Sequence, residues 1–244
     1  MTSQPSIGTC NLCGKDFAKN VISRHLKKCL PKAYRQEQSA SAGEKTQKTF
    51  WINVWGKYLP EYWLHLEAPA ASKLEDLDQF LRNIWLECCG HLSAFTIGST
   101  RYEMDTGMVD AMWKDFFGPS QPPQSMNVRL YNILKPGLTF GHEYDFGTTT
   151  ELSLKVVAEG EKPGQSKEIR VLARNNTPTI PCAVCGKPAT LVCSQCIYEG
   201  PKAWLCKKCS RKHKCGEDAF LPVVNSPRVG QCGYTGDADF DLDF

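Results

Sequence analysis

The first thirty residues hold cysteine and histidine side chains at the spacing of a tetrahedral metal site. Two residues separate Cys10 from Cys13, and three separate His25 from Cys29. A Cys-x2-Cys turn directs two thiolates to one point, and side chains four positions apart on a helix share a face. Four such ligands bind zinc and fold a peptide too small to fold alone. The pattern therefore predicts one structural Zn²⁺ ion.

The stretches CNLCGKDF and RHLKKC make this unit similar to a C2HC variant of the C2H2 zinc finger. The loop between the ligand pairs has eleven residues, where the family usually has about twelve, and Cys29 replaces the last histidine. Pro31 predicts that the ligand-bearing helix ends at Leu30. One such finger reads only about three base pairs, so sequence-specific DNA binding by it alone is not expected. The side chains expected to contact phosphates or base edges, or else to form a solvated face, are Lys19, Asn20, Arg24, Lys27 and Lys28.

The last third of the chain holds a second and larger group of metal-ligand residues. Three Cys-x2-Cys pairs fall within fewer than thirty residues, which predicts zinc binding. Each structural zinc ion needs four ligands, so the three pairs require two ligands more. Eight cysteines complete two all-cysteine sites, with His213 as the alternate, and bring the expected total to three zinc ions. The expected cysteine ligands, in order, are Cys182, Cys185, Cys193, Cys196, Cys206, Cys209, Cys215 and Cys232.

Two ways of connecting these ligands are open. In a sequential arrangement, the first two Cys-x2-Cys pairs share one ion across a loop of seven residues. In a cross-brace, the first pair joins the third, and the second pair takes two of His213, Cys215 and Cys232. We favour the cross-brace, because the early spacings resemble B-box and MYND-type modules, which are chiefly protein-interaction domains. Neither pattern has a counterpart of Cys232, so the membership of the second site stays open.

Residues 49–175, between these metal-binding ends, have the pattern of an α/β (α+β) domain with a mixed sheet. EYWLHLEA alternates as a half-buried strand does, and both of its faces are partly apolar. A capping box at residues 72–75 precedes apolar residues at helical spacing, which stop at Gly90. SAFTIGSTRYEM predicts a hairpin, and LTFGHEYDFG, ELSLKVVA and EIRVLAR predict three further strands. Shorter helices are expected at 107–117 and 127–134.

Other reactive residues of this domain have plain structural interpretations. His142, Glu143 and Asp145 alternate along a strand, so they cannot all converge, and a hairpin end with satisfied polar groups is the favoured interpretation. Cys88 and Cys89 end the amphipathic helix, which predicts at least one inert core thiol. The neighbouring histidine lacks a partner at ligand spacing. The sequence therefore predicts no catalytic residue here.

The stretches YWLHLEAP, SKLEDLDQFLRNIW and LYNILKPGLTFGHEYDFGTTTELSLKVV resemble the plasmid pRiA4b ORF-like family, a TnpR-type insertion-element passenger. The resemblance implies an association with mobile elements but no defined activity. Family members often follow the YDFG signature with an acidic residue, a Trp and a His, where this chain has Thr148, Thr150 and Leu152. No catalytic or metal role is therefore transferred to those positions. Flanking zinc modules similar to those of some members, including the ending VVNSPRVGQCGYTG, favour Cys232 as a ligand.

Composition limits the class of protein. Hydrophobic residues make up 41% and charged residues 23% of the 244 residues, as in a folded protein. The start of the chain lacks a basic leader, and no apolar run is long enough to cross a membrane. The expected compartment is the cytosol, or the nucleus if the host has one, and its reducing conditions leave thiols free for metal. Residues 1–35 carry seven basic residues against one acidic residue, so a polyanionic partner is plausible on electrostatic grounds.

These patterns predict a zinc-binding adaptor that binds DNA or RNA and has no membrane partner. The alternatives are a protein-interaction adaptor that uses the B-box-like or MYND-like module, and an enzyme such as a nuclease. Since each predicted zinc site has four protein ligands, none leaves a position for catalytic water, which disfavours an enzyme. The sequence leaves the oligomeric state open. The predicted parts are a zinc finger at 1–32, a polar linker at 33–48, the central domain at 49–175, a two-zinc module at 176–234 and an acidic disordered tail at 235–244.

Overall fold

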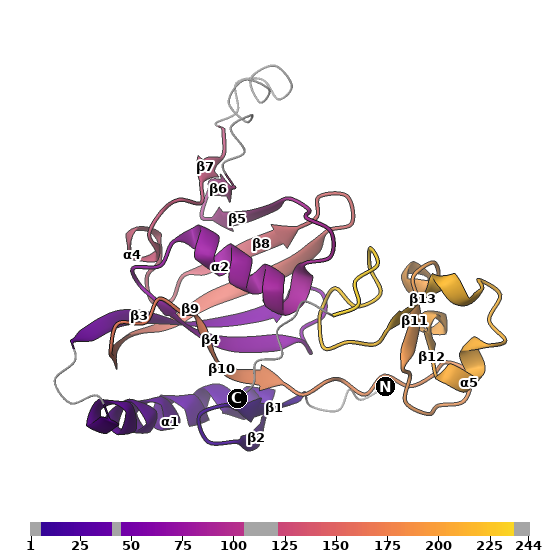
Figure 1. The fold of residues 1–244 in the computed structure, drawn as a ribbon, viewed down its shortest axis with the longest axis horizontal. Coiled ribbons are helices and arrows are strands. Elements are labelled where there is room, and N and C mark those ends of the chain that lie inside the picture. The colour runs from indigo at the N-terminus through magenta and orange to yellow at the C-terminus, as the bar shows by residue number, and fades with distance from the viewer. Residues whose placement is uncertain (1–5, 41–44, 105–121, 237–244) are drawn as a thin grey trace. The chain divides into compact units, whose positions relative to one another are not determined.

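The computed structural model describes residues 6–40, 45–104 and 122–236. The expected helix at 107–117 and most of the expected acidic tail lie outside these residues. The chain divides into two compact units, which are described separately (Figure 1). The first unit comprises Met1–Phe80 and Leu92–Asn175, and the second comprises Leu81–His91 and Asn176–Phe244.

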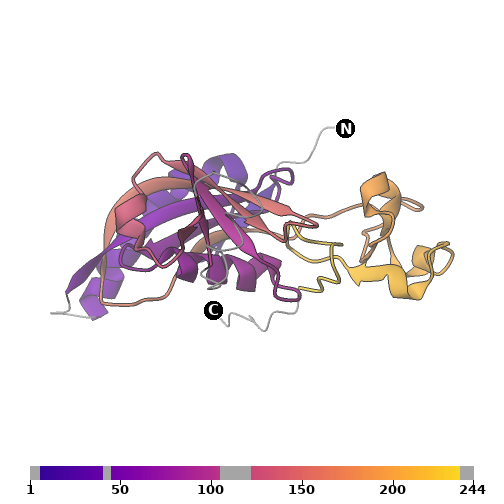
Figure 2. The ribbon, with the colours of Figure 1, turned by 90° about the horizontal axis from the view of Figure 1, so that it is seen from above.

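A large sheet forms the centre of the first unit. Its strands are β1 (Ile7–Cys10), β2 (Lys15–Ala18), β3 (Thr46–Gly56), β4 (Trp63–Pro69), β5 (Ser93–Ile97), β6 (Thr100–Glu103), β7 (Gln124–Ser125), β8 (Thr139–Tyr144), β9 (Thr150–Pro163) and β10 (Arg170–Asn175). These ten strands lie in the order β2-β1-β10-β4-β3-β9-β8-β5-β6-β7. Only β6 and β7 pair in parallel, so the sheet is mixed, as the sequence predicts. Seen from above, the strands cross at an angle because the sheet is twisted (Figure 2).

Helices cover both faces of this sheet. Glu67 on β4 accepts a hydrogen bond from the Tyr34 hydroxyl, on a helix that packs on one face. Asp78 contacts His142 of β8 from a helix on the other face. Because both faces are covered, β4 is buried along its whole length, which explains its apolar residues on both sides. The helices of this unit are α1 (Lys19–Ala40), α2 (Leu74–Leu81, the last residue of which belongs to the second unit) and α4 (Leu130–Ile133).

The N-terminal metal-ligand segment is part of this sheet. β1 pairs antiparallel with β10, so Gly8 lies opposite Asn175. Ile22 and Leu26 of α1 are fully buried against Trp51 and Trp63 of the sheet. The zinc-finger-like segment therefore packs on the central domain, where the sequence predicted a separate module.

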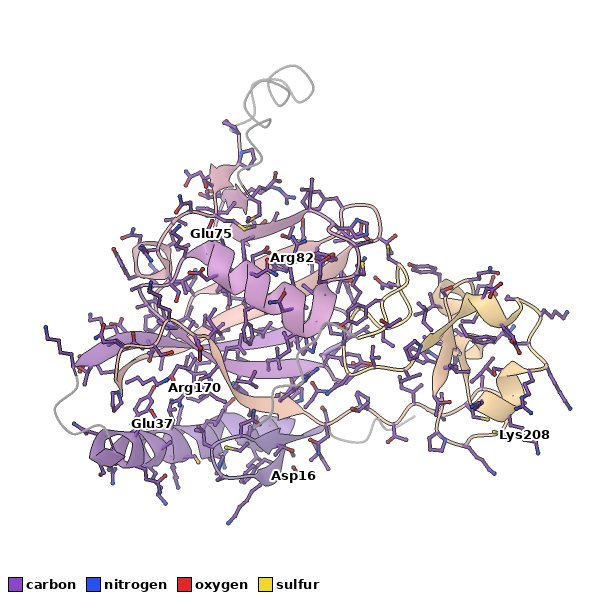
Figure 3. The ribbon with its side chains drawn as sticks, viewed as in Figure 1. Asp16, Glu37, Glu75, Arg82, Arg170 and Lys208 are labelled. Carbon is purple, nitrogen blue, oxygen red and sulfur yellow. The ribbon has the colours of Figure 1, made fainter. Side chains whose placement is uncertain are left out.

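Helix α1 continues beyond Pro31, where the sequence predicted its end. A proline in a helix interior removes one backbone donor and usually ends or bends the helix. Here the later turns are held by the sheet, because Arg170 of β10 forms an ion pair with Glu37, Nη1 to Oε1 at 2.6 Å (Figure 3). The described residues of the expected linker 33–48 are therefore the end of a helix and the start of β3.

The second unit is smaller and is built around short elements. Buried Val192 and Leu205 contribute to its core, and the three-stranded sheet has the order β12-β11-β13. No helix among the described residues is both long and apolar enough to cross a membrane. Its elements are η1 (Arg82–Leu86), β11 (Leu191–Cys193), η2 (Ile197–Glu199), η3 (Pro201–Ala203), β12 (Trp204–Leu205), α5 (Lys207–Ser210), η4 (Glu217–Ala219) and β13 (Phe220–Pro222).

Replacing Gly8 by alanine tests how the N-terminal segment joins the sheet. A Cβ there would lie 2.3 Å from the Arg174 carbonyl oxygen and 2.5 Å from the Trp63 ring, and backbone cannot yield as a flexible side chain can. We expect Gly8→Ala to lower the free energy of unfolding by roughly 1–3 kcal/mol, measured by denaturant titration of the zinc-loaded protein. Gly141→Ala is the matched control, since its nearest contact lies at 3.9 Å. Equal effects of the two substitutions would contradict the expected steric conflict.

Candidate metal centres

Two Cys-x2-Cys segments each form a backbone turn of the same kind. In the first, the Gly14 amide donates to the Cys10 carbonyl at 2.7 Å, and in the second the Gly186 amide donates to the Cys182 carbonyl at 2.9 Å. Both glycines have positive φ, 67° and 72°, a conformation that glycine adopts without strain. Each turn brings the two thiols of its pair to the same side.

The four N-terminal ligands come together around one point. Cys10 ends β1, while His25 and Cys29 lie one turn apart on α1. The Cys10 and Cys29 sulfurs are 4.0 Å apart, and the Cys13 sulfur lies 3.4 Å from Nε2 of His25. The ring of Phe17 stacks on the His25 imidazole at 3.9 Å and fixes its orientation. All four ligand atoms lie within 4.8 Å of one another, so this group could hold a metal ion.

These separations suit a tetrahedral ion of the size of zinc. Zinc binds sulfur at about 2.3 Å and nitrogen at about 2.0–2.1 Å. In a tetrahedron, these bond lengths place two sulfurs about 3.8 Å apart and a sulfur and a nitrogen about 3.5 Å apart. The N-terminal distances agree with both values to within a few tenths of an ångström.

The C-terminal cysteine pairs interleave. The first pair lies with the third, and the Cys185 and Cys206 sulfurs are 3.6 Å apart. The second pair lies with His213 and Cys215; the Cys196 sulfur is 3.5 Å from Nε2 of His213 and 3.6 Å from the Cys215 sulfur. This is the order of a cross-brace, and the distances again suit tetrahedral zinc.

Cys232 does not complete this second C-terminal group, which has His213 as its fourth member. Instead, Cys232 lies with Cys88, Cys89 and His91 in a further group. Among the described residues there are therefore four groups that could hold metal ions, where the sequence predicted three. Neither Cys88 nor Cys89 is buried, so the expectation of a core thiol there is wrong. The run Cys-Cys-Gly-His was the available signal, but it lacks the Cys-x2-Cys spacing.

The thiols of each group influence one another's protonation. Burial raises the pKa of Cys10 to about 12. Burial also opposes ionisation of Cys182, but backbone amides that donate to its sulfur, that of Cys206 first, lower its pKa to about 6. Burial and the neighbouring thiols raise the pKa of Cys209, in the same group, to about 12. Without a cation, Cys182 and Cys209 of one group thus have pKa values shifted in opposite directions. A bound cation would favour the thiolate form of every ligand.

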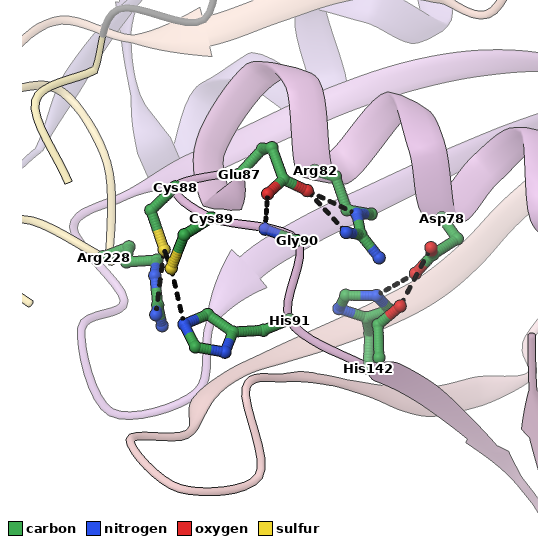
Figure 4. Close-up of polar contacts among 10 residues, drawn as sticks. Asp78, Arg82, Glu87, Cys88, Cys89, Gly90, His91, His142 and Arg228 are labelled. Atoms are coloured by element: carbon green, nitrogen blue, oxygen red, sulfur yellow. Dashed lines mark hydrogen bonds and ion pairs between the residues drawn. The ribbon is translucent and has the colours of Figure 1, made fainter. Parts of the chain in front are cut away.

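Asp78, Ser93 and His142 of the first unit form a buried polar group without the order of a Ser-His-Asp triad. The Ser93 hydroxyl donates to Asp78 at 2.9 Å, and Asp78 contacts Nε2 of His142 at 2.7 Å (Figure 4). A nucleophilic serine must instead contact the histidine, which acts as its base. All three side chains are at most 2% exposed, so substrate cannot reach them. Glu143 pairs with Arg101 away from this group, as the alternation of the strand predicts.

Four of the five residues expected to contact nucleic acid are exposed on α1: Asn20, Arg24, Lys27 and Lys28. Lys19 differs, because its ammonium donates to the carbonyl of Pro60. Burial also lowers the pKa of Lys19. This lysine therefore supports the start of the helix more than it supplies free charge.

Comparisons with known proteins find distant matches among solved structures. No family model matches the chain, and no curated protein matches it. Among solved structures, a protein of unknown function from Methanosarcina mazei Go1 aligns with a TM-score of 0.44 at 14% sequence identity, over 52% of this chain and 70% of that one. The resemblance to the pRiA4b ORF-like family remains a prediction.

Replacing His213 tests the membership of the second C-terminal group. Because Nε2 of His213 lies 3.5 Å from the Cys196 sulfur, His213→Ala leaves that group one ligand short. We expect native mass spectrometry of the variant to show one zinc ion fewer than in the wild type. Lys212→Ala removes an exposed neighbour and should leave the count unchanged. An unchanged count in His213→Ala would contradict the assignment.

Proposed function

We propose that this protein is a zinc-stabilised adaptor that binds nucleic acid through the phosphate backbone. The observation that carries the proposal is a row of exposed basic side chains on one face of α1. These are Arg24, Lys27, Lys28, Lys32 and Arg35.

The arrangement of α1 leaves this face free. Ile22, Leu26 and Leu30 are buried on the opposite side of the same helix, so the hydrophobic contacts fix which side faces solvent. Glu37, the one acidic residue of α1, forms an ion pair with Arg170. From Arg24 to Arg35 the helix rises about 16 Å, along which double-stranded DNA carries about ten phosphate charges.

Zinc has a positioning role in this proposal. The ligands His25 and Cys29 lie on α1 itself, and Cys10 and Cys13 lie in the adjoining turn. An ion held by all four would pin the N-terminal half of the helix to β1. Since each site would have four protein ligands, the zinc ions are structural and supply no catalytic water.

A second basic surface lies in the C-terminal unit. The stretch from Lys202 to Lys214 has six basic residues and no acidic residue. All six are exposed: Lys202, Lys207, Lys208, Arg211, Lys212 and Lys214. Each would add a phosphate contact without adding sequence specificity. The resemblance to the pRiA4b ORF-like family, with its association with mobile elements, is consistent with a role on DNA.

A protein-interaction adaptor is the second candidate. The C-terminal unit exposes two large apolar side chains, Val184 and Tyr198, each 71% accessible. Exposed apolar groups on a small rigid module suit a protein partner. Capture of a partner that survives nuclease treatment but is lost on zinc chelation would favour this candidate.

Removing charge from α1 tests nucleic-acid binding. We expect the wild type to bind labelled duplex DNA or RNA with an affinity that falls steeply with salt. The triple variant Arg24→Ala, Lys27→Ala, Lys28→Ala should bind roughly a hundredfold more weakly near 0.1 M salt, and its salt slope should fall by about three. Fluorescence anisotropy over a series of salt concentrations measures both quantities.

A charge-matched variant separates local contacts from net charge. Lys135, Lys155 and Lys167 are exposed lysines outside α1, and replacing all three by alanine removes the same charge. We expect this control to bind nearly as the wild type does. Equal losses in the two triple variants, or wild-type binding that is insensitive to salt, would refute the proposal.

A further inference from the structure

The group of Cys88, Cys89, His91 and Cys232 has the chemistry of a metal site of its own. The Cys89 sulfur lies 3.8 Å from that of Cys232 and 3.5 Å from that of Cys88. Nε2 of His91 lies 3.0 Å from the Cys89 sulfur and 3.1 Å from the Cys232 sulfur. The sulfur separations suit tetrahedral zinc, and the imidazole needs to withdraw by about half an ångström to reach the separation expected for zinc.

The helical side of this group is shaped by a π-turn. η1 ends where the Glu87 amide donates to the Arg82 carbonyl at 2.8 Å, five residues back. The Glu87 carboxylate accepts from the Arg82 guanidinium at 2.6 Å and from the Gly90 amide at 2.6 Å (Figure 4). Gly90 has a φ of 77°, which turns the chain sharply between Cys89 and His91. A π-turn with such support often occurs at a functional site.

The other side is a segment without regular structure, Val223–Tyr234, which we call the C-terminal strap. Its Ser226 hydroxyl donates to the Trp85 carbonyl at 2.6 Å. Gly230 is buried and has a φ of 80°, and a Cβ there would lie 2.3 Å from Ile197. Cys232 itself has a φ of 46°, which is unusual for a residue with a side chain. The strap therefore packs tightly against its neighbours as far as Gly230, and Cys232 has a strained backbone conformation.

A buried arginine supplies the charge that such a site needs. Arg228 of the strap is fully buried, and its Nη2 donates to the Cys88 sulfur at 3.4 Å. Zinc bound by three thiolates and a neutral imidazole carries a single net negative charge. A buried charge is costly unless an opposite charge accompanies it. The guanidinium and the loaded site would therefore neutralise each other.

We propose that Cys88, Cys89, His91 and Cys232 bind a further zinc ion, which fastens the C-terminal strap to the segment Leu81–His91. The site is closed, with four protein ligands, so its role is structural. It is distinct from the two sites of the cross-brace and does not involve α1. The proposal therefore stands or falls independently of nucleic-acid binding.

Metal counting on the full chain tests this site. We expect native mass spectrometry to find four zinc ions in the wild type and three in Cys232→Ser. Thr235→Ala changes a nearby exposed residue that is not a ligand, and it should keep four. Salt-dependent binding to DNA or RNA should be unchanged in Cys232→Ser. Three ions in both the wild type and Cys232→Ser would overturn the proposal.

A measurement on the wild type covers the case in which Cys232→Ser fails to fold. Cys89 and Cys232 are exposed, so burial alone cannot shield them from a thiol-alkylating reagent. If zinc binds here, both cysteines should react as slowly as Cys13, another exposed thiol in a metal-ligand group, and should become reactive when a chelator is added. Peptide mass spectrometry reads each cysteine separately. Rapid alkylation of Cys89 and Cys232 while Cys13 stays protected would overturn the proposal, as would a disulfide between them.

Discussion

Crowding of ionisable ligands is the physical constraint on which this structure depends. In each of the four groups, the ligand atoms lie within 4.8 Å of one another. Thiolates at such distances repel one another, and thiols left protonated form only weak hydrogen bonds. A divalent cation reverses the sign of the interaction and makes each group attractive. In the second unit the elements that carry or adjoin the ligands are short; β11 has three residues and α5 has four, too few to be stable alone. Metal binding and folding would therefore be coupled in these parts of the chain.

The crowded ligands of the N-terminal group connect the metal centres with the proposed function, because two of them lie on α1. A metal ion bound by His25 and Cys29 would hold α1 near its start, and the ion pair of Glu37 with Arg170 holds it near its end. Between these two attachments, buried leucines fix the rotation of the helix about its axis. The basic face would therefore be presented in one orientation, and on the proposed function less conformational entropy would be lost when a polyanion binds. In the proposed function, the ten-stranded sheet supports the helix.

Local patterns were predictable from sequence, and long-range contacts were not. Three of the metal-ligand groups contain Cys-x2-Cys turns, whose two ligands are adjacent in space whatever the rest of the chain does, although the sequence placed Cys232 where His213 completes the group of Cys193. Alternation likewise predicts β4, β8, β9 and β10. Cys232 belongs to the group of Cys88, Cys89 and His91 because it contacts His91, 141 positions away in the sequence. Ligand spacing along the chain cannot predict a contact over that separation. The continuation of α1 past Pro31 depends on Arg170, 133 positions from Glu37. In both cases a tertiary contact outweighs the local signal.

Amide hydrogen exchange with and without zinc tests the central claim most directly. Removal of the metal should abolish protection in β1, in the first half of α1, in η1 and throughout β11–β13. β3, β4 and β9 should keep their protection, because a hydrophobic core on both faces holds them independently of any metal. Unchanged protection across Cys182–Pro222 after complete removal of zinc would contradict the account, since it would mean that the crowded ligand groups are stable without a cation.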